Sequence, residues 1–194
     1  MNILAALAAD PQQPTPVRGT EHWDGTRALD YMADDGGRAA AGYRGSAGDC
    51  VARSIAIASG LPYAEVYAAL ASGTGSQRAT STRGKRAASA RSGINVTRKW
   101  FKDYMQSLGL VWTPTMQIGS GCKVHLLAGE LPAGRLVVAL SKHYTAVIDG
   151  VIHDTFDPTR ATLYPDEQGR AGGGFGRMGH RCVYGYWRAA GATA

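Results

Sequence analysis

Asp149 and Gly150 form the sequence feature that most restricts the fold of this chain. They separate two apolar runs, HYTAVI at 143–148 and VIHDTF at 151–156. An Asp-Gly pair between such runs is the strongest short signal for a β-hairpin with a two-residue turn, because turns of this kind need left-handed backbone angles. The segment therefore predicts two adjacent antiparallel strands.

Further elements are predicted on both sides of this hairpin. The apolar run at 135–140 is typical of a central strand, and the run at 181–188 is typical of a last strand. Earlier in the chain, apolar residues recur at helical spacing after Asp49, after Pro62 and after Asn95. Helices followed by an antiparallel sheet predict an α+β fold. A content of 26 Gly in 194 residues also disfavours a helix-only bundle.

The chain is long enough for one domain with its own core. Residues 1–43 show little periodicity and contain several prolines and the run DDGGR. We expect a weakly structured arm there, with no regular structure beyond one turn near 27–32. The domain itself is predicted to span 44–190.

Positive charge is concentrated in the segment at 72–92, which is small, polar and free of acidic residues. Such a composition predicts a loop, because it buries too little apolar surface to offset the entropy of ordering. Arg83, Lys85 and Arg86 suit a nucleic-acid backbone or an acidic protein. A solvated insertion is the simpler interpretation, since no aromatic residues alternate with the charges.

The three cysteines, Cys50, Cys122 and Cys182, are too few and too scattered for a disulfide framework or a zinc site. An odd number of cysteines suits a reducing compartment with at least one free thiol. No apolar run approaches the ~18–20 residues that cross a bilayer. We therefore expect a soluble, cytoplasmic protein that has no cofactor or metal and does not bind a membrane.

Cys50 is the candidate nucleophile. It directly follows Asp49, the predicted N-cap of a helix, so its thiol lies against unpaired N–H groups and the positive end of the helix dipole. Both favour the thiolate, the reactive form. A thiolate nucleophile also needs a proton carrier, and that carrier needs an acceptor that orients it.

The hairpin offers both partners. With a tight turn at 149–150, Thr145 lies opposite Asp154, and strand side chains alternate between the two faces. His143 and Asp154 then share one face as diagonal neighbours, roughly 7 Å apart between backbones. Asp157 falls on the other face, which favours Asp154 as the acceptor, although a one-residue slip in register would reverse that choice.

Two segments resemble the papain-like cysteine peptidases. GDCVARSIAIASGLPYAEVYAAL at 48–70 is similar to their nucleophile helix, and LVVALSKHYTAVIDGVIHDTFDP at 136–158 is similar to their His- and Asp-bearing strands. The resemblance is strongest to peptidase-C39-like and small bacterial and phage papain-like proteins, and covers about Gly45 to Pro158. It implies a papain-like fold in which Cys50 is the nucleophile, His143 the general base and acid, and Asp154 the orienting residue.

The sequence departs from that family before the cysteine. Papain-like enzymes usually place a Gln there as an oxyanion donor, whereas this chain has none between Tyr43 and Cys50. The Cys50 N–H is one alternative donor, with Ser46 or Arg44 as a second. The stretch GSGCKVH around Cys122 is interpreted as a turn that enters the sheet, with a second thiol site as the alternative.

The sequence thus predicts a cysteine hydrolase that cleaves an amide or isopeptide bond of a protein or peptide through a thioester. Two alternatives stay open. A transglutaminase-type acyltransferase would use the same triad with a different resolving nucleophile. A catalytically inactive papain-like adaptor would instead bind nucleic acid or an acidic protein through the basic loop.

Overall fold

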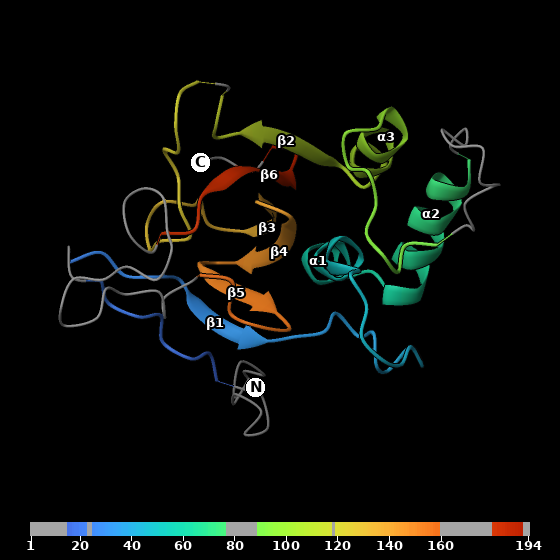
Figure 1. Cartoon of the computed structure of the whole chain (residues 1–194), viewed down its shortest axis with the longest axis horizontal. Coiled ribbons are helices and arrows are strands. Elements are labelled where there is room, and N and C mark those ends of the chain that lie inside the picture. The colour runs from blue at the N-terminus through green and yellow to red at the C-terminus, as the bar shows by residue number, and fades with distance from the viewer. Residues whose placement is uncertain (1–14, 23–24, 77–88, 118, 160–179, 192–194) are drawn as a thin grey trace, which may run out of the picture.

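The computed structural model describes residues 15–22, 25–76, 89–117, 119–159 and 180–191, and these form a mixed α+β fold (Figure 1). The helices of this part of the chain are α1 (Cys50–Ser59), α2 (Tyr63–Gly75) and α3 (Lys99–Ser107). The strands are β1 (Asp30–Ala33), β2 (Leu110–Pro114), β3 (Arg135–Leu140), β4 (His143–Ile148), β5 (Val151–Asp154) and β6 (Val183–Ala189). The α+β class predicted from the order of elements is confirmed.

All the named strands join one six-stranded sheet in the order β1-β5-β4-β3-β6-β2. The β1–β5 pair is parallel, and the other neighbouring pairs are antiparallel. The helices gather on one side of the sheet, and α1 is the helix that lies against β4, β3 and β5 (Figure 1). The N-terminus of α1 is therefore brought close to the β4–β5 hairpin.

The hairpin has the predicted register. Val147 lies opposite Ile152, and the turn residues Asp149 and Gly150 have positive φ angles of 48° and 80°. The Asp149 carboxylate also accepts a hydrogen bond from the Gly134 N–H at 2.8 Å. This side chain thus connects the turn to the residue before β3.

The helices follow the predicted pattern with one difference in length. Gly60 ends α1 with a φ of 74°, and Phe101 and Met105 are the buried residues of α3. Helix α2, however, continues to Gly75, so the predicted loop at 72–92 was placed too early. A Cβ on Gly73 would lie only 2.2 Å from the Trp100 ring, which indicates that the small residues at the end of α2 serve close packing.

The expected N-terminal arm is more structured than predicted where the structure describes it. Residues 30–33 form β1 instead of a turn, and they pair in parallel with β5 so that Ala33 lies opposite Asp154. A strand this short shows almost no periodicity, and its pairing partner lies more than a hundred residues away in sequence. The prediction of an arm separate from the domain was therefore wrong for these residues.

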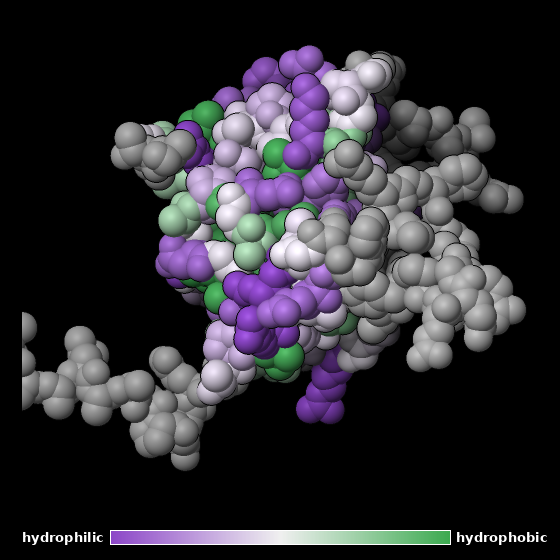
Figure 2. Space-filling view, turned by 90° about the vertical axis from the view of Figure 1, so that its left-hand side faces the viewer, coloured by the Kyte–Doolittle hydropathy of each residue, from purple (hydrophilic) through white to green (hydrophobic). Residues whose placement is uncertain are grey.

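The sheet has a hydrophobic core on each face. On the helix side, Val137, Ala146 and Trp187 pack with residues of the three helices. On the opposite side, Leu136 and Val147 pack beneath the loops that carry Leu29 and Leu126. Figure 2 views the molecule from this loop side, where hydrophilic residues with scattered apolar ones cover the visible surface. Because both faces are covered, the central strands are almost continuously apolar.

A disulfide joins Cys122 and Cys182, whose Cα atoms lie 5.9 Å apart. The sequence analysis regarded the cysteines as too scattered for a disulfide framework and did not foresee this pair, whereas the expected free thiol is Cys50. The sulfur atoms meet because the neighbouring residue His125 forms a β-bridge with Cys182, although the two cysteines are 60 residues apart in sequence. The cysteines therefore do not support the expectation of a reducing compartment.

None of the helices in the described ranges is long and apolar enough to cross a bilayer.

Candidate active site

Cys50 is the first residue of α1 and a half-buried free thiol. Its N–H belongs to the first turn, whose donors have no partner within the helix. The loop before it is held by the end of the basic segment: the Gly48 N–H donates to the Arg91 carbonyl at 2.8 Å, and the Arg91 guanidinium donates to the Ser46 carbonyl at 3.0 Å. These two hydrogen bonds hold the loop at 46–48, which leads into Cys50, against Arg91.

His143 and Asp154 lie at the open end of the hairpin, because one is the first residue of β4 and the other the last residue of β5. The His143 Nε2 atom is 2.6 Å from the Asp154 Oδ2 atom, and the side chains are 11% and 7% exposed. The His143 ring also interacts with the Cys50 thiol, since each of the two groups shifts the pKa of the other. Since Asp154 occupies Nε2, Nδ1 is the nitrogen left to face the sulfur.

Hydrogen bonding lowers the pKa of Cys50 and raises the pKa of His143, and both shifts favour the charged forms. Burial alone would raise the pKa of the Cys50 thiol, but hydrogen bonds from His143 and from the Tyr144 N–H lower it overall. Burial would likewise lower the pKa of His143, yet its hydrogen bonds to Asp154 and Cys50 raise that pKa to about 9. Both shifts are in the direction that favours a thiolate beside an imidazolium.

The Asp154 carboxylate is held in position through its own backbone and its neighbour. Its Oδ1 atom accepts a hydrogen bond from the Thr155 N–H at 2.7 Å, which leaves Oδ2 for His143. The Asp154 carbonyl accepts hydrogen bonds from the Tyr31 hydroxyl at 3.2 Å and the Asp34 N–H at 2.8 Å. Strand β1 and the turn after it thus support the acceptor.

The other carboxylates near the hairpin have different partners. Asp34 lies 3.1 Å from the Nδ1 atom of His153. Asp157 accepts a hydrogen bond from the Thr159 N–H within its own turn. The structure therefore brings Asp154 to His143 and leaves Asp157 outside the triad.

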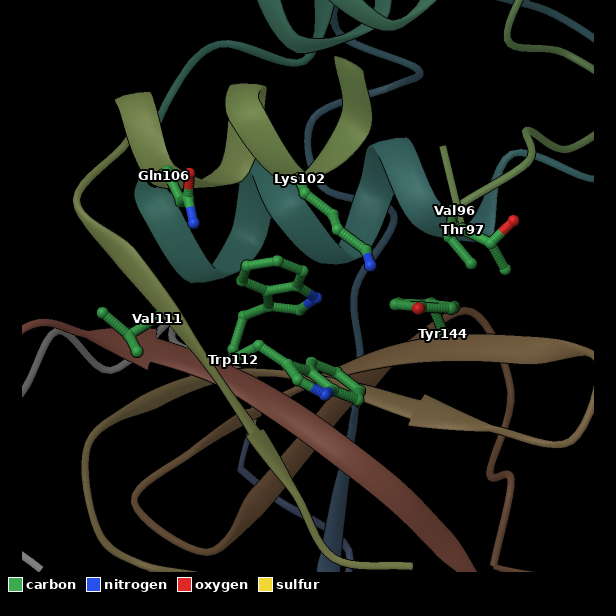
Figure 3. Close-up of a pocket in the computed structure, with 8 residues that line it drawn as sticks. Val96, Thr97, Lys102, Gln106, Val111, Trp112 and Tyr144 are labelled. Carbon is green, nitrogen blue, oxygen red and sulfur yellow. The ribbon is translucent and has the colours of Figure 1, made fainter. Parts of the chain in front are cut away.

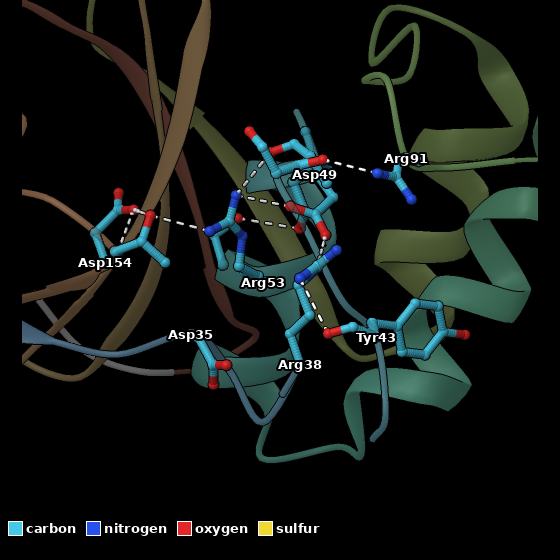
Figure 4. A network of polar contacts seen from close by, with 12 residues as sticks. Asp35, Arg38, Tyr43, Asp49, Arg53, Arg91 and Asp154 are labelled. Carbon is cyan, nitrogen blue, oxygen red and sulfur yellow. Dashed lines mark hydrogen bonds and ion pairs between the residues drawn. The ribbon is translucent and has the colours of Figure 1, made fainter. Parts of the chain in front are cut away.

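A buried ion cluster is centred on Asp49, the residue before the candidate nucleophile Cys50 (Figure 4). Asp49 occupies the N-cap position of α1, but its side chain makes no capping hydrogen bond. Its fully buried carboxylate instead lies 2.8 Å from the Arg38 guanidinium and 2.7 Å from the Arg53 guanidinium. The Tyr63 hydroxyl donates to the same carboxylate at 2.5 Å. The sequence interpretation of Asp49 as a simple helix cap missed this role.

Arg53 links the ion cluster to the triad. One guanidinium nitrogen pairs with Asp49, and another donates to the Thr155 hydroxyl at 2.9 Å. Figure 4 shows Arg53 reaching from α1 toward the strand end that carries Asp154. The spacing of Asp49 and Arg53 by one helical turn is the sequence signal that suggests such a pair. Nothing in the sequence indicates that Arg38 joins them.

The structure shows no hydrogen bond between the two predicted oxyanion donors and the triad within the described residues. Ser46 and Arg44 lie on the exposed loop before Cys50. Their carbonyls accept hydrogen bonds from Arg91 and Arg38. Neither side chain has a hydrogen bond or ion pair within the described ranges. The backbone N–H of Cys50 is the donor that the site itself positions for an oxyanion.

The remaining predicted sites fall into two groups. Arg83, Lys85 and Arg86 lie outside the described residues. Cys122 is bonded to Cys182, so the alternative of a second thiol site was wrong, and the neighbouring His125 pairs with Glu130. Within the part of the chain that the structure describes, no cluster of His, Cys, Asp or Glu is arranged to hold a metal ion.

Comparison with known proteins yields no matching family model, no similar curated protein and no similar solved structure.

Proposed function

We propose that this protein is a papain-like cysteine hydrolase that cleaves an amide or isopeptide bond. The observation that carries the proposal is the convergence of three groups: His143 lies 2.6 Å from the Asp154 carboxylate, and the His143 ring and the Cys50 thiol each shift the pKa of the other toward its charged form. A buried cysteine alone is more often structural. A thiol at a helix N-terminus with an imidazole and an orienting carboxylate is the arrangement that nucleophilic catalysis requires.

In the proposed reaction, the Cys50 thiolate attacks the carbonyl carbon of the substrate and the carbonyl π-electrons move to oxygen. The Cys50 N–H donates a hydrogen bond to that oxyanion. The His143 imidazolium then protonates the departing amine as the C–N bond breaks, which leaves a thioester. Neutral His143 takes a proton from water, the resulting hydroxide adds to the thioester, and the C–S bond breaks to restore the thiolate.

The ordering of the imidazole supports both proton transfers. Asp154 accepts from Nε2 and stabilises the positive ring, so Nδ1 carries the proton that the leaving amine needs. The carboxylate is itself fixed by Thr155, β1 and, through Thr155, by Arg53. Little reorganisation is required between the two steps.

Labelling by iodoacetamide at neutral pH, followed by peptide mass spectrometry, tests the reactivity of Cys50. We expect Cys50 to react faster than a small free thiol, and the variant His143→Ala to lose that advantage. The matched control is His153→Ala, which removes a ring on the same hairpin that pairs with Asp34 instead. Reaction at the rate of an ordinary thiol would overturn the proposal.

Turnover is tested with a mixture of peptides, by searching for new amino termini that wild type produces and Cys50→Ala does not. Adding a primary amine to the same mixture separates hydrolysis from acyl transfer, because a transferase would form amine adducts. A reactive Cys50 that produces neither new termini nor adducts would contradict hydrolysis.

A further inference from the structure

The structure contains a pocket of about 440 Å³ between α3 and the helix side of the sheet. Its walls come from the loop before α3, from α3, and from β2, β4 and β6 (Figure 3). The lining residues are Val96, Thr97, Lys102, Gln106, Val111, Trp112, Tyr144 and Trp187. None of the mechanism described above uses this pocket.

Tyr144 joins the pocket to the candidate nucleophile. It directly follows His143 in β4 and its backbone N–H lowers the pKa of the Cys50 thiol, whereas its side chain lines the pocket. Burial and the negative charge of Cys50 raise the pKa of the Tyr144 hydroxyl to about 12, so this hydroxyl stays protonated. A group bound in the pocket would therefore lie next to the reacting bond.

The walls of the pocket are largely aromatic. The indole rings of Trp112 and Trp187 have centroids 5.3 Å apart, on directly paired residues of β2 and β6. A Cβ on Gly185 would lie 2.3 Å from the Trp112 ring, so this glycine provides the space that the ring occupies. Flat aromatic walls of this kind bind a flat or apolar group.

The polar groups of the pocket are rich in hydrogen-bond donors, and none of the lining residues is acidic. Figure 3 shows the Lys102 side chain reaching from α3 toward the indole rings and Tyr144. Lys102 makes no ion pair within the described ranges, whereas Lys99, three residues earlier, pairs with Asp103 at 2.8 Å. The buried indole N–H of Trp187 has no acceptor in the described part of the chain. Because this nitrogen has almost no accessible surface, the donors that a ligand in the pocket can reach belong to the other lining side chains, Lys102 among them.

We infer that this pocket binds the substrate residue beside the scissile bond, and that it selects a side chain with an apolar body and a carboxylate tip. The inference depends on the proposed function. The aromatic walls hold the apolar body, and Lys102 pairs with the carboxylate. The pocket thereby gives the hydrolase a preference for acidic substrates.

Three peptide vinyl sulfones test this preference, and they differ only in the residue next to the reacting group. That residue is phenylalanine, 4-carboxyphenylalanine or 4-aminomethylphenylalanine. We expect wild type to react about tenfold faster with the carboxylate probe than with the aminomethyl probe, which is the effect of one charge-assisted hydrogen bond. Lys102→Glu reverses that order. Lys99→Glu makes the same change in net charge on the solvent side of α3. We expect this control to keep the wild-type order of the probe rates. Equal rate ratios in wild type and Lys102→Glu would overturn the inference.

Two further measurements separate this inference from the proposed function. Iodoacetamide has no side chain to recognise, so its rate at Cys50 reports the nucleophile alone, and dividing each probe rate by it removes any effect of Lys102→Glu on the thiol. The amide of N-acetyl-4-carboxyphenylalanine, titrated into Cys50→Ala while tryptophan fluorescence is followed, reports the pocket alone. We expect saturable binding that weakens about tenfold when Lys102→Glu is added. Binding that is absent, or unaffected by Lys102→Glu, rejects the pocket even if Cys50 is reactive.

Discussion

The Asp154 Oδ2 atom lies 2.6 Å from the His143 Nε2 atom, although the two residues stand on different strands. This contact fixes the ring in the orientation that turns Nδ1 toward Cys50. It also contributes to the raised pKa of His143. The contact therefore controls both the geometry and the charge of the proposed proton carrier.

Replacing this carboxylate tests its contribution. Asp154→Asn keeps an acceptor of nearly the same shape but removes the negative charge, so we expect the pKa of His143 to fall and turnover to drop by about 100-fold or more. The pKa is followed by NMR titration of the ring. Asp157→Asn is the control, because Asp157 binds its own turn. An unchanged pKa in Asp154→Asn would show that the carboxylate does not stabilise the imidazolium.

The rate at which Cys50 reacts with iodoacetamide has a predicted dependence on pH. The lowered pKa of the thiol keeps the thiolate populated below the ordinary cysteine value of about 8.5, so the rate rises at a lower pH than for free cysteine. Turnover falls again as the pH passes about 9, where His143 loses the proton that the leaving amine needs. In His143→Ala, the inflection for alkylation moves toward the ordinary value. A wild-type inflection at or above that value would rule out the ion pair.

The Asp49 cluster is predicted to stabilise the fold as well as the site. Asp49→Ala leaves two arginines without their buried partner, which we expect to lower the free energy of unfolding by about 3–5 kcal/mol. Urea denaturation measures the change. Asp103→Ala removes an exposed carboxylate that pairs with Lys99, and it is expected to cost within about 0.5 kcal/mol. Similar losses in the two variants would mean that the buried cluster adds nothing specific.

We expect the disulfide to stabilise the fold without affecting the reactivity of Cys50. Closing a loop between residues 60 apart stabilises a fold by about 4 kcal/mol in the chain-entropy description. The double variant Cys122→Ser, Cys182→Ser therefore unfolds at lower urea concentration, and reductant lowers the stability of wild type but not of the variant. We expect iodoacetamide to label Cys50 at an unchanged rate in the folded variant. A lost reactivity there would connect the disulfide to the site.

Local signals predicted the parts of the molecule that depend on neighbours in sequence. The Asp149-Gly150 turn sets the register, and the register places Asp154 and not Asp157 on the face of His143. The glycine at 60 ends α1 because its left-handed conformation suits a helix end. These features need only turn chemistry and side-chain periodicity.

The parts that sequence reasoning missed depend on distant contacts. Strand β1 is recognisable only by its pairing with β5, and Cys122 meets Cys182 only after the sheet has formed. The Asp49 side chain makes no capping hydrogen bond because two arginines and Tyr63 bind it instead. The sequence around Asp49 does not indicate all of these competing partners. Lys102 and Trp112 come from neighbouring elements, but the pocket exists only when β6 adds Trp187.

The parallel pairing of β1 with β5 has a consequence for proteolysis. Cleavage between Ala33 and the α1 helix would allow the first strand to dissociate, and β5 would become the outer strand of the sheet. The backbone of Asp154 would then lose its bonds to Tyr31, and a carboxylate on a fraying outer strand holds an imidazole poorly. A single cut before α1 would thus inactivate the proposed enzyme while leaving all three triad residues intact.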